Sequence, residues 1–147
     1  MNRTDNLLGK DKIILNAKPR DKWEAIRMAG DLLVKAGHVT PAYVEKMEGR
    51  ERLATTYIGS GVAIPHGTLD SKGEIKSTGI SVVQVPGGLD FGEGNTVYVL
   101  LGIAAVGSEH LDVLSHIAIV CSDEDNVRKA ASAQTAEEII ALFGGGL

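Results

Sequence analysis

The sequence is poor in cysteine, in long apolar runs and in clustered positive charge. Cys121 is the single cysteine, which excludes an internal disulfide framework and a cysteine-based zinc cluster and is what a reducing compartment permits. We expect its thiol simply to pack in the apolar run around it. The longest apolar run, residues 97–106, is about half of the roughly 20 residues that a membrane-spanning helix needs. The first five residues lead into no signal-like hydrophobic segment, so we expect a cytoplasmic protein without membrane insertion.

Charge of one sign is not concentrated anywhere. The formal net charge is −4, and the one basic stretch, residues 18–22, is short. The electrostatic footprint of nucleic-acid-binding proteins is missing, and we expect no nucleic-acid partner. The chain has 147 residues, of which 44% are apolar and 23% charged, and no repeat or Pro/Ser-rich linker divides it. We therefore expect residues 1–147 to form one globular domain.

Capping residues mark the expected helices. Asp21 with Glu24, and Thr135 with Glu138, have the spacing of a capping box, in which the first side chain accepts a hydrogen bond from the backbone N–H of the second residue. Thr40, followed by proline, combines an N-cap hydroxyl with the residue best suited to the first helical position. We expect helices from 21 to about 37, from 40 to about 50, from 108 onward, and two short helices after that, the last beginning at 135.

Segments rich in β-branched residues and bounded by Gly, Pro or Asn predict strands. Four such segments are residues 13–15, 62–64, 79–85 and 96–104. The turns that bound them include Pro86-Gly87-Gly88 and residues 92–95. Strands and helices together in this order predict an α/β sandwich with a mixed sheet.

The most unusual stretch lies between residues 59 and 68, where a short apolar strand runs into a proline, a histidine, a glycine and a threonine. Pro65 has a fixed φ and restricts the residue before it to extended geometry, while Gly67 permits a sharp turn and the close approach of a bulky group. His66 would therefore project from a strand end with little bulk beside it. A neutral imidazole is nucleophilic near pH 7, and a phosphorylated ring nitrogen is a good leaving group. His66 is thus a candidate for both accepting and donating a phosphoryl group.

Phosphoryl transfer needs hydrogen-bond donors and positive charge around the three equatorial oxygens. Arg50, near the end of the second helix, offers a planar guanidinium suited to bidentate phosphate contact. His110, at the opening of the third helix, could share donors with a phosphate. We also expect free N–H groups near Ser108 and Glu109 at this helix start to favour an anion.

Residues 63–68, Ala-Ile-Pro-His-Gly-Thr preceded by Gly59, resemble the active-site motif of the enzyme IIA domains of the mannitol/fructose class in the bacterial phosphoenolpyruvate-dependent phosphotransferase system. The resemblance continues in register over nearly the whole chain. It includes residues 43–47 with Arg50-Glu51, Thr56-Tyr57, residues 85–92, and residues 102–105 with Glu109-His110-Leu111.

This resemblance implies a phosphohistidine at His66, formed on Nε2, charged from the phosphocarrier protein HPr and discharged to a cysteine of enzyme IIB, or of an IICB protein, in the mannitol permease. It implies that Arg50 and His110 support the phosphoryl group. Gly67 and Thr68 would contact it as well, unless Thr68 merely starts the next turn. The implied fold is a single α/β domain with a mixed five-stranded sheet flanked by helices on both faces. No cofactor is implied.

The threonine after Pro-His-Gly and the Arg-Glu pair of the second helix favour the mannitol members, so we expect a free-standing phosphocarrier for mannitol uptake and phosphorylation. Mannitol members can carry a glutamate where this chain has Ser60, which leaves the effect of that difference open. Two rivals remain. One is a fructose-type or nitrogen-regulatory enzyme IIA, acting as a module whose phosphorylation state changes which protein it binds. The other is a non-catalytic domain in which His66 is an interior histidine.

Other features have simpler interpretations. His116 and Asp112, four residues apart on the third helix, are too few for a closed metal site, and we expect no metal. His38 follows Gly37 in the loop between the first two helices, where we expect an exposed polar residue. Glycines 59, 61 and 67 match neither the P-loop nor the dinucleotide-binding spacing, which excludes ATP and NAD sites of those kinds.

Overall fold

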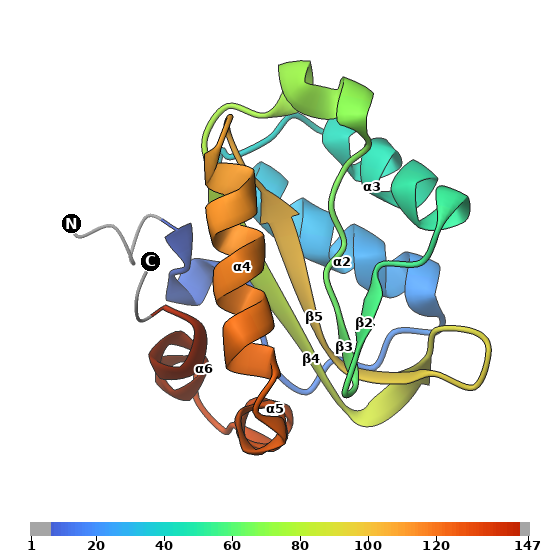
Figure 1. Ribbon diagram of the computed structural model, residues 1–147, viewed down its shortest axis with the longest axis vertical. Coiled ribbons are helices and arrows are strands. Elements are labelled where there is room, and N and C mark those ends of the chain that lie inside the picture. The colour runs from blue at the N-terminus through green and yellow to red at the C-terminus, as the bar shows by residue number, and fades with distance from the viewer. Residues whose placement is uncertain (1–6, 145–147) are drawn as a thin grey trace.

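A five-stranded mixed β-sheet forms the centre of the molecule (Figure 1). The computed structural model describes residues 7–144. Its strands are β1 (Ile13–Ile14), β2 (Tyr57–Gly59), β3 (Val62–Ala63), β4 (Gly79–Asp90) and β5 (Thr96–Ala104). The strand order is β1-β4-β5-β3-β2, with β4 antiparallel to β5, β2 antiparallel to β3, and the other two pairs parallel. The expected mixed five-stranded sheet is therefore confirmed.

Helices cover both faces of this sheet, as expected (Figure 1). On one side lie α2 (Lys22–Lys35) and α3 (Ala42–Leu53), and on the other lie α4 (Glu109–Cys121), α5 (Glu124–Ser132) and α6 (Ala136–Phe143). Two short 3₁₀ segments, η1 (Lys10–Lys12) and η2 (Leu69–Glu74), complete the described elements. Within residues 7–144, no helix combines the length and apolar character that crossing a membrane requires.

The sheet separates two apolar cores, and alternate side chains of β4 contribute to each of them. Val83 and Val85 belong to the core beneath α2 and α3, whereas Ile80 and Val82 belong to the core beneath α4, α5 and α6. Successive side chains of a strand point to opposite faces, so a strand covered on both sides reads as a nearly continuous apolar run. Cys121 lies in the second core, where burial raises the pKa of its thiol to about 11, and it packs there as expected.

The helix starts follow the predicted capping at two places and depart from it at a third. Asp21 accepts a hydrogen bond from the Glu24 N–H, and α2 begins at the next residue. Thr135 likewise accepts from the Glu138 N–H at the start of α6. The prediction for Thr40 is wrong, because its hydroxyl donates to the Glu74 carboxylate instead of capping α3. That helix begins at Ala42 and continues three residues beyond Arg50 to Leu53.

Two strand predictions also need correction. The residues of β2 were not predicted as a strand, because the element has three residues and ends in a tight turn in which Ser60 has a φ of 55°. The predicted turn at Pro86-Gly87-Gly88 is a bulge within β4, where the register shifts between Gln84 and Leu89. Gly88 has a φ of 81°, and a Cβ there would lie 2.8 Å from Thr96 of the paired strand, so the bulge requires glycine.

His38 is buried, at 7% exposure, and not an exposed loop residue as predicted. Gly37 turns the chain inward with a φ of 83°, and the absence of a side chain at Gly79 leaves room for the imidazole ring. Nε2 of His38 lies 2.7 Å from Nζ of Lys12, which is itself buried, and Nδ1 lies 2.9 Å from Oγ of Ser77. Sequence spacing gave no sign of this pair because its members lie 26 residues apart.

The buried His38 should make folding stability depend on pH. Burial, reinforced by the charge of Lys12, lowers the pKa of His38 below its usual value. As pH falls through about 6.5, the unfolded chain binds a proton that the folded ring resists, so stability is lost. We expect His38→Gln, which keeps an acceptor for Lys12 but does not titrate, to flatten the pH profile of the unfolding free energy between pH 7 and 5.

Urea denaturation at several pH values would measure this difference. The slope of the wild type should exceed that of His38→Gln by at most about 1.4 kcal/mol per pH unit, the limit for one proton. Parallel profiles for the two proteins would contradict the effect assigned to His38.

Candidate functional site

His66 lies where the pairing of β3 with β5 continues past the end of β3. The N–H of Ile103 in β5 donates to the carbonyl of Pro65 at 2.9 Å, and His66 forms an isolated parallel bridge with Ile103. Pro65 has no N–H to donate, but it lies at the end of a short strand, where a missing donor is tolerated by the sheet. The imidazole therefore projects from a strand end, as the sequence predicts.

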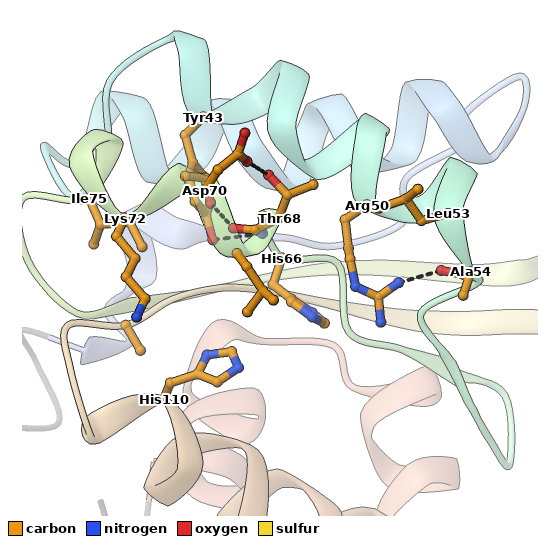
Figure 2. A pocket seen from close by; sticks show the side chains of 14 residues that line it. Tyr43, Arg50, Leu53, Ala54, His66, Thr68, Asp70, Lys72, Ile75 and His110 are labelled. Carbon is orange, nitrogen blue, oxygen red and sulfur yellow. Dashed lines mark hydrogen bonds between the residues drawn. The ribbon is translucent and has the colours of Figure 1, made fainter.

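The five predicted site residues line one open cavity of about 600 Å³ (Figure 2). They come from three parts of the fold: α3, the loop after β3, and the start of α4. The polar residues that line the cavity are Tyr43, Arg50, His66, Thr68, Asp70, Ser71, Lys72 and His110. Ser60 is not among the lining residues and lies in the turn between β2 and β3.

The hydrogen bond of His66 determines which ring nitrogen faces the cavity. Nδ1 lies 2.7 Å from the carbonyl oxygen of Ile64. A carbonyl oxygen only accepts, so Nδ1 carries the proton and the lone pair of a neutral ring is on Nε2. Within residues 7–144, no side chain or backbone group is hydrogen-bonded to Nε2. This nitrogen is therefore the nucleophilic atom of the ring.

The surroundings of His66 keep the ring neutral. Burial lowers the pKa of His66, and electrostatic interactions with Arg50 and His110 lower it further, against the hydrogen bond to Ile64 and the charge of Glu51, which raise it. A histidine with a pKa below its usual value of about 6.5 carries a lone pair at pH 7. The positive charge of Arg50, which helps to keep the unmodified ring neutral, would also favour an anion attached to it.

Arg50 and His110 approach His66 from opposite sides (Figure 2). Arg50 lies in the last turn of α3, where Nη1 donates to the carbonyl of Ala54 at 2.6 Å. This bond holds the guanidinium at the cavity wall. His110 lies in the first turn of α4, with its ring centroid 5.6 Å from that of His66 and the two planes at 62°. The two side chains can therefore contact a group on Nε2 from both sides.

Glu51, next to Arg50, is buried at 4% exposure and holds the loop after α3. Its Oε1 accepts from the N–H of Thr56 at 2.8 Å and from the Thr56 hydroxyl at 2.7 Å, and Oε2 lies 3.3 Å from Nζ of Lys22. Burial opposes ionisation, but the hydrogen bonds from Thr55, Thr56 and Lys22 outweigh it and lower the pKa of the carboxyl. The Ala54 carbonyl that Arg50 binds belongs to this loop.

The anion site expected on free N–H groups near Ser108 and Glu109 is wrong for Glu109 and stays a prediction for Ser108. The N–H of Glu109 donates to Val106 at 3.2 Å, and the N–H of His110 donates to Gly107 at 3.4 Å. Both N–H groups are therefore already hydrogen-bonded within the turn that leads into α4. At this side of the cavity, the His110 side chain is therefore the group positioned to meet an anion.

Thr68 and Gly67 line the cavity, but both already have partners. The Thr68 hydroxyl donates to Asp70, which also lies 3.3 Å from Nζ of Lys46, and Thr68 precedes η2, so it does start the next turn. These hydrogen bonds, that of Thr68 first, lower the pKa of Asp70. The N–H of Gly67 donates to the Tyr43 hydroxyl at 2.8 Å.

Tyr43, Asp70 and Lys72 were not predicted to belong to the site. Tyr43 and Arg50 are seven residues apart, and positions i and i+7 lie on one face of a helix, so helical periodicity could have found Tyr43. Asp70 and Lys72 carry no such signal, since they lie in the 3₁₀ segment that folds back over the cavity.

His116 has a structural partner away from the cavity. Its Nε2 lies 2.9 Å from the carbonyl oxygen of Phe143 at the end of α6. Among residues 7–144, no three His, Cys, Asp or Glu side chains are grouped so that they could hold a metal ion.

Comparison with known proteins agrees with this geometry. Residues 6–144 match the family model described as "Phosphoenolpyruvate-dependent sugar phosphotransferase system, EIIA 2". The chain is 50% identical over 137 residues to the mannitol-specific phosphotransferase enzyme IIA component of Geobacillus stearothermophilus, covering 93% of this chain and 94% of that relative. It is 47% identical over 137 residues to the component of the same name from Bacillus subtilis, covering 93% and 96%.

A solved structure is similar over the same length. It is the complex of enzyme IIA mannitol and phosphorylated enzyme IIB mannitol from Escherichia coli, one chain of which matches with a TM-score of 0.88 and 38% identity, covering 94% of this chain and 97% of that one.

Close packing around Gly67 gives a testable consequence. A Cβ at this position would overlap Oγ of Ser71 and lie 2.6 Å from the ring of the buried Tyr43. We expect Gly67→Ala to lower the unfolding free energy by about 1 to 3 kcal/mol, the usual cost of overpacking. The matched control is Gly73→Ala in η2, where no atom lies within 4 Å of the added Cβ. Urea denaturation of both variants measures the difference, and equal stabilities would contradict the assigned overlap.

Proposed function

The chain belongs to the EIIA 2 family of the phosphoenolpyruvate-dependent sugar phosphotransferase system, and from this premise we propose that it carries a phosphoryl group on Nε2 of His66. The group arrives from phospho-HPr and leaves to a cysteine of enzyme IIB in the mannitol permease. The proposal is carried by the position of His66 Nε2, which lies in an open cavity between Arg50 and His110 and is hydrogen-bonded to none of the residues that the structure describes.

The transfer needs no general base at His66. The Nε2 lone pair attacks phosphorus while the phosphorus–nitrogen bond to the donor histidine breaks, and the electron pair of that bond stays with the donor ring. Nδ1 of His66 keeps its proton and its 2.7 Å hydrogen bond to Ile64. In the second transfer a cysteine thiolate attacks phosphorus, the phosphorus–Nε2 bond breaks, and the neutral ring returns with the same proton on Nδ1.

Arg50 and His110 stabilise the phosphoryl oxygens during both transfers. The charge that develops in a loose transition state is spread over the three equatorial oxygens, and preorganised donors aimed at that charge lower the barrier without reorganisation. Arg50 supplies a permanent positive charge on one side, and His110 supplies a ring N–H on the other. Thr68 and Gly67 shape the cavity floor, and Thr68 can reach the phosphoryl group if its hydroxyl leaves Asp70.

Apolar side chains around the cavity form the docking rim for both partners. We define this rim as Leu53, Leu69 and Leu111, which are 77%, 92% and 68% exposed. Leu53 and Leu69 line the cavity directly, and Leu111 follows His110. Because both partners must reach the same Nε2, they bind one at a time, through modest interfaces typical of transient complexes.

The proposed sugar, mannitol, is taken from the names of the relatives. Both sequence relatives, at 50% and 47% identity, are named mannitol-specific, which favours mannitol over the fructose-type and nitrogen-regulatory alternatives. The proposed place of action is the cytoplasm, where HPr would charge the carrier.

Phosphorylation of purified protein tests the carrier and its site together. With phosphoenolpyruvate, enzyme I and HPr, the wild type should gain one acid-labile, base-stable phosphoryl group in its intact mass. His66→Ala should gain none, whereas His116→Ala, which removes a histidine outside the cavity, should gain one like the wild type. Addition of a mannitol enzyme IIB should then discharge the carrier. A phosphorylated His66→Ala protein would move the site to another residue.

Arg50 provides a second test. We expect Arg50→Ala to fold normally but to slow transfer about 100-fold or more, as loss of a preorganised transition-state donor does. The matched control is Arg52→Ala, which removes an exposed arginine of the same helix that pairs with Glu48 at 3.5 Å. Quenched-flow rates in both directions measure the effect, and unchanged rates for Arg50→Ala would remove this residue from the mechanism.

A further inference from the structure

The hydroxyl of Tyr43 makes two hydrogen bonds at the base of the cavity. It donates to the carbonyl of Ile103 at 2.8 Å and accepts from the N–H of Gly67 at 2.8 Å. Tyr43 is 2% exposed and Ile103 is fully buried, so the bond between them is shielded from water, while the bond to Gly67 is partly buried. The side chain of Tyr43, which extends from α3, thus connects the last residues of β5 with the loop that carries His66.

These bonds bracket His66 in the chain. Before it, the Pro65 carbonyl accepts from the Ile103 N–H at 2.9 Å, and after it, the Gly67 N–H donates to Tyr43. Both connections end on Ile103, one on its N–H directly and the other on its carbonyl through the tyrosine. The backbone on each side of His66 is therefore fixed to one residue of the sheet.

The direction of each bond requires a neutral tyrosine. A carbonyl only accepts and an N–H only donates, so the hydroxyl must give its single proton to Ile103 and receive that of Gly67. Burial raises the pKa of Tyr43 to about 12, although the hydrogen bond from Gly67 lowers it. The arrangement therefore persists across the pH range in which transfer takes place.

We propose that Tyr43 is a positioning residue for phosphoryl transfer, whose hydroxyl holds the loop at His66 so that Nδ1–H stays directed at the Ile64 carbonyl and Nε2 faces the cavity. The role rests on the proposed function, because positioning matters here only for a ring that reacts. Tyr43 does not contact the phosphoryl group. It acts through the backbone of Gly67, and a small misplacement of a reacting atom can cost up to about 100-fold in rate.

A matched pair of variants isolates the hydroxyl. Tyr43→Phe keeps the ring in the core and removes one oxygen. Tyr57→Phe makes the same change at a tyrosine whose hydroxyl also accepts a glycine N–H, that of Gly61 at 3.4 Å, outside the cavity. A third protein, with p-aminophenylalanine in place of Tyr43, keeps a donor for Ile103 but offers Gly67 only a poor acceptor, because the lone pair of an aniline nitrogen is delocalised into the ring. It tests the bond to Gly67 even if Tyr43→Phe fails to fold.

The first readout is ¹⁵N NMR of the histidine rings in unphosphorylated protein. The wild type and Tyr57→Phe should show His66 with its proton on Nδ1 alone, whereas Tyr43→Phe should show the proton shared between the two nitrogens. The second readout is single-turnover transfer from phospho-HPr. Tyr43→Phe should lower the maximal rate about 10- to 100-fold and leave the half-saturating concentration of phospho-HPr unchanged, because the docking rim is intact. The p-aminophenylalanine protein, which lacks a good acceptor for Gly67, should likewise show the shared proton and a lower maximal rate.

The outcomes separate the two proposals. Wild-type ring protonation and a wild-type rate in Tyr43→Phe, or in the p-aminophenylalanine protein, would overturn the positioning role, even where stability falls. If neither the wild type nor Tyr57→Phe accepts a phosphoryl group, the proposed function fails, while the NMR comparison still decides whether Tyr43 controls the His66 ring.

Discussion

The hydrogen bond from Nδ1 of His66 to the carbonyl of Ile64 is the interaction on which the candidate site depends. At 2.7 Å it fixes the ring proton on Nδ1 and leaves the lone pair on Nε2. The bond forms within three residues, so it needs only the extended backbone that Pro65 imposes on Ile64. It holds its direction, however, only if the loop keeps its place, and that place is determined by β5. The local hydrogen bond between His66 and Ile64 therefore orients the ring only because the long-range pairing with β5 holds the loop in place.

The groups around Nε2 come from both sides of the sheet. Arg50 is carried by α3, which packs on one apolar core, and His110 is carried by α4, which packs on the other. Ile103 of the central strand β5 connects the two sides, because Tyr43 of α3 donates to its carbonyl and its side chain lies in the apolar core on which α4 packs. Arg50 is further held through the loop that Glu51 anchors, since the carbonyl it binds lies between Glu51 and Thr56. Loss of either core would therefore separate the charge from the nucleophile.

Local signals in the sequence predicted local structure well. Asp21 and Thr135 cap their helices because the bonds span three residues, and the Pro65-His66-Gly67 run presents an imidazole because its backbone limits are intrinsic to those residue types. Residue chemistry, together with the family resemblance, also predicted that His66, Arg50 and His110 belong to the site. All three line one cavity. Thr40 failed as a cap because a competing carboxylate, Glu74, lies 34 residues away. His38 was missed for a similar reason, since it reaches Lys12 and Ser77 through tertiary packing that spacing does not encode. Tyr43 was missed although its seven-residue spacing to Arg50 places both on one face of α3.

The protonation state of His66 in the proposed cycle explains why the backbone around this residue is held so firmly. Nδ1 keeps its proton before, during and after each transfer, so no acid or base has to be tuned to the pH. The rate then depends on how closely Nε2, phosphorus and the leaving atom approach a line, and on the charge around the equatorial oxygens. A ring fixed through the Pro65 carbonyl, the Gly67 N–H and the Ile64 carbonyl meets the first requirement while the cavity around it stays open. In the proposed cycle, docking supplies the specificity, and the site needs rigidity more than enclosure.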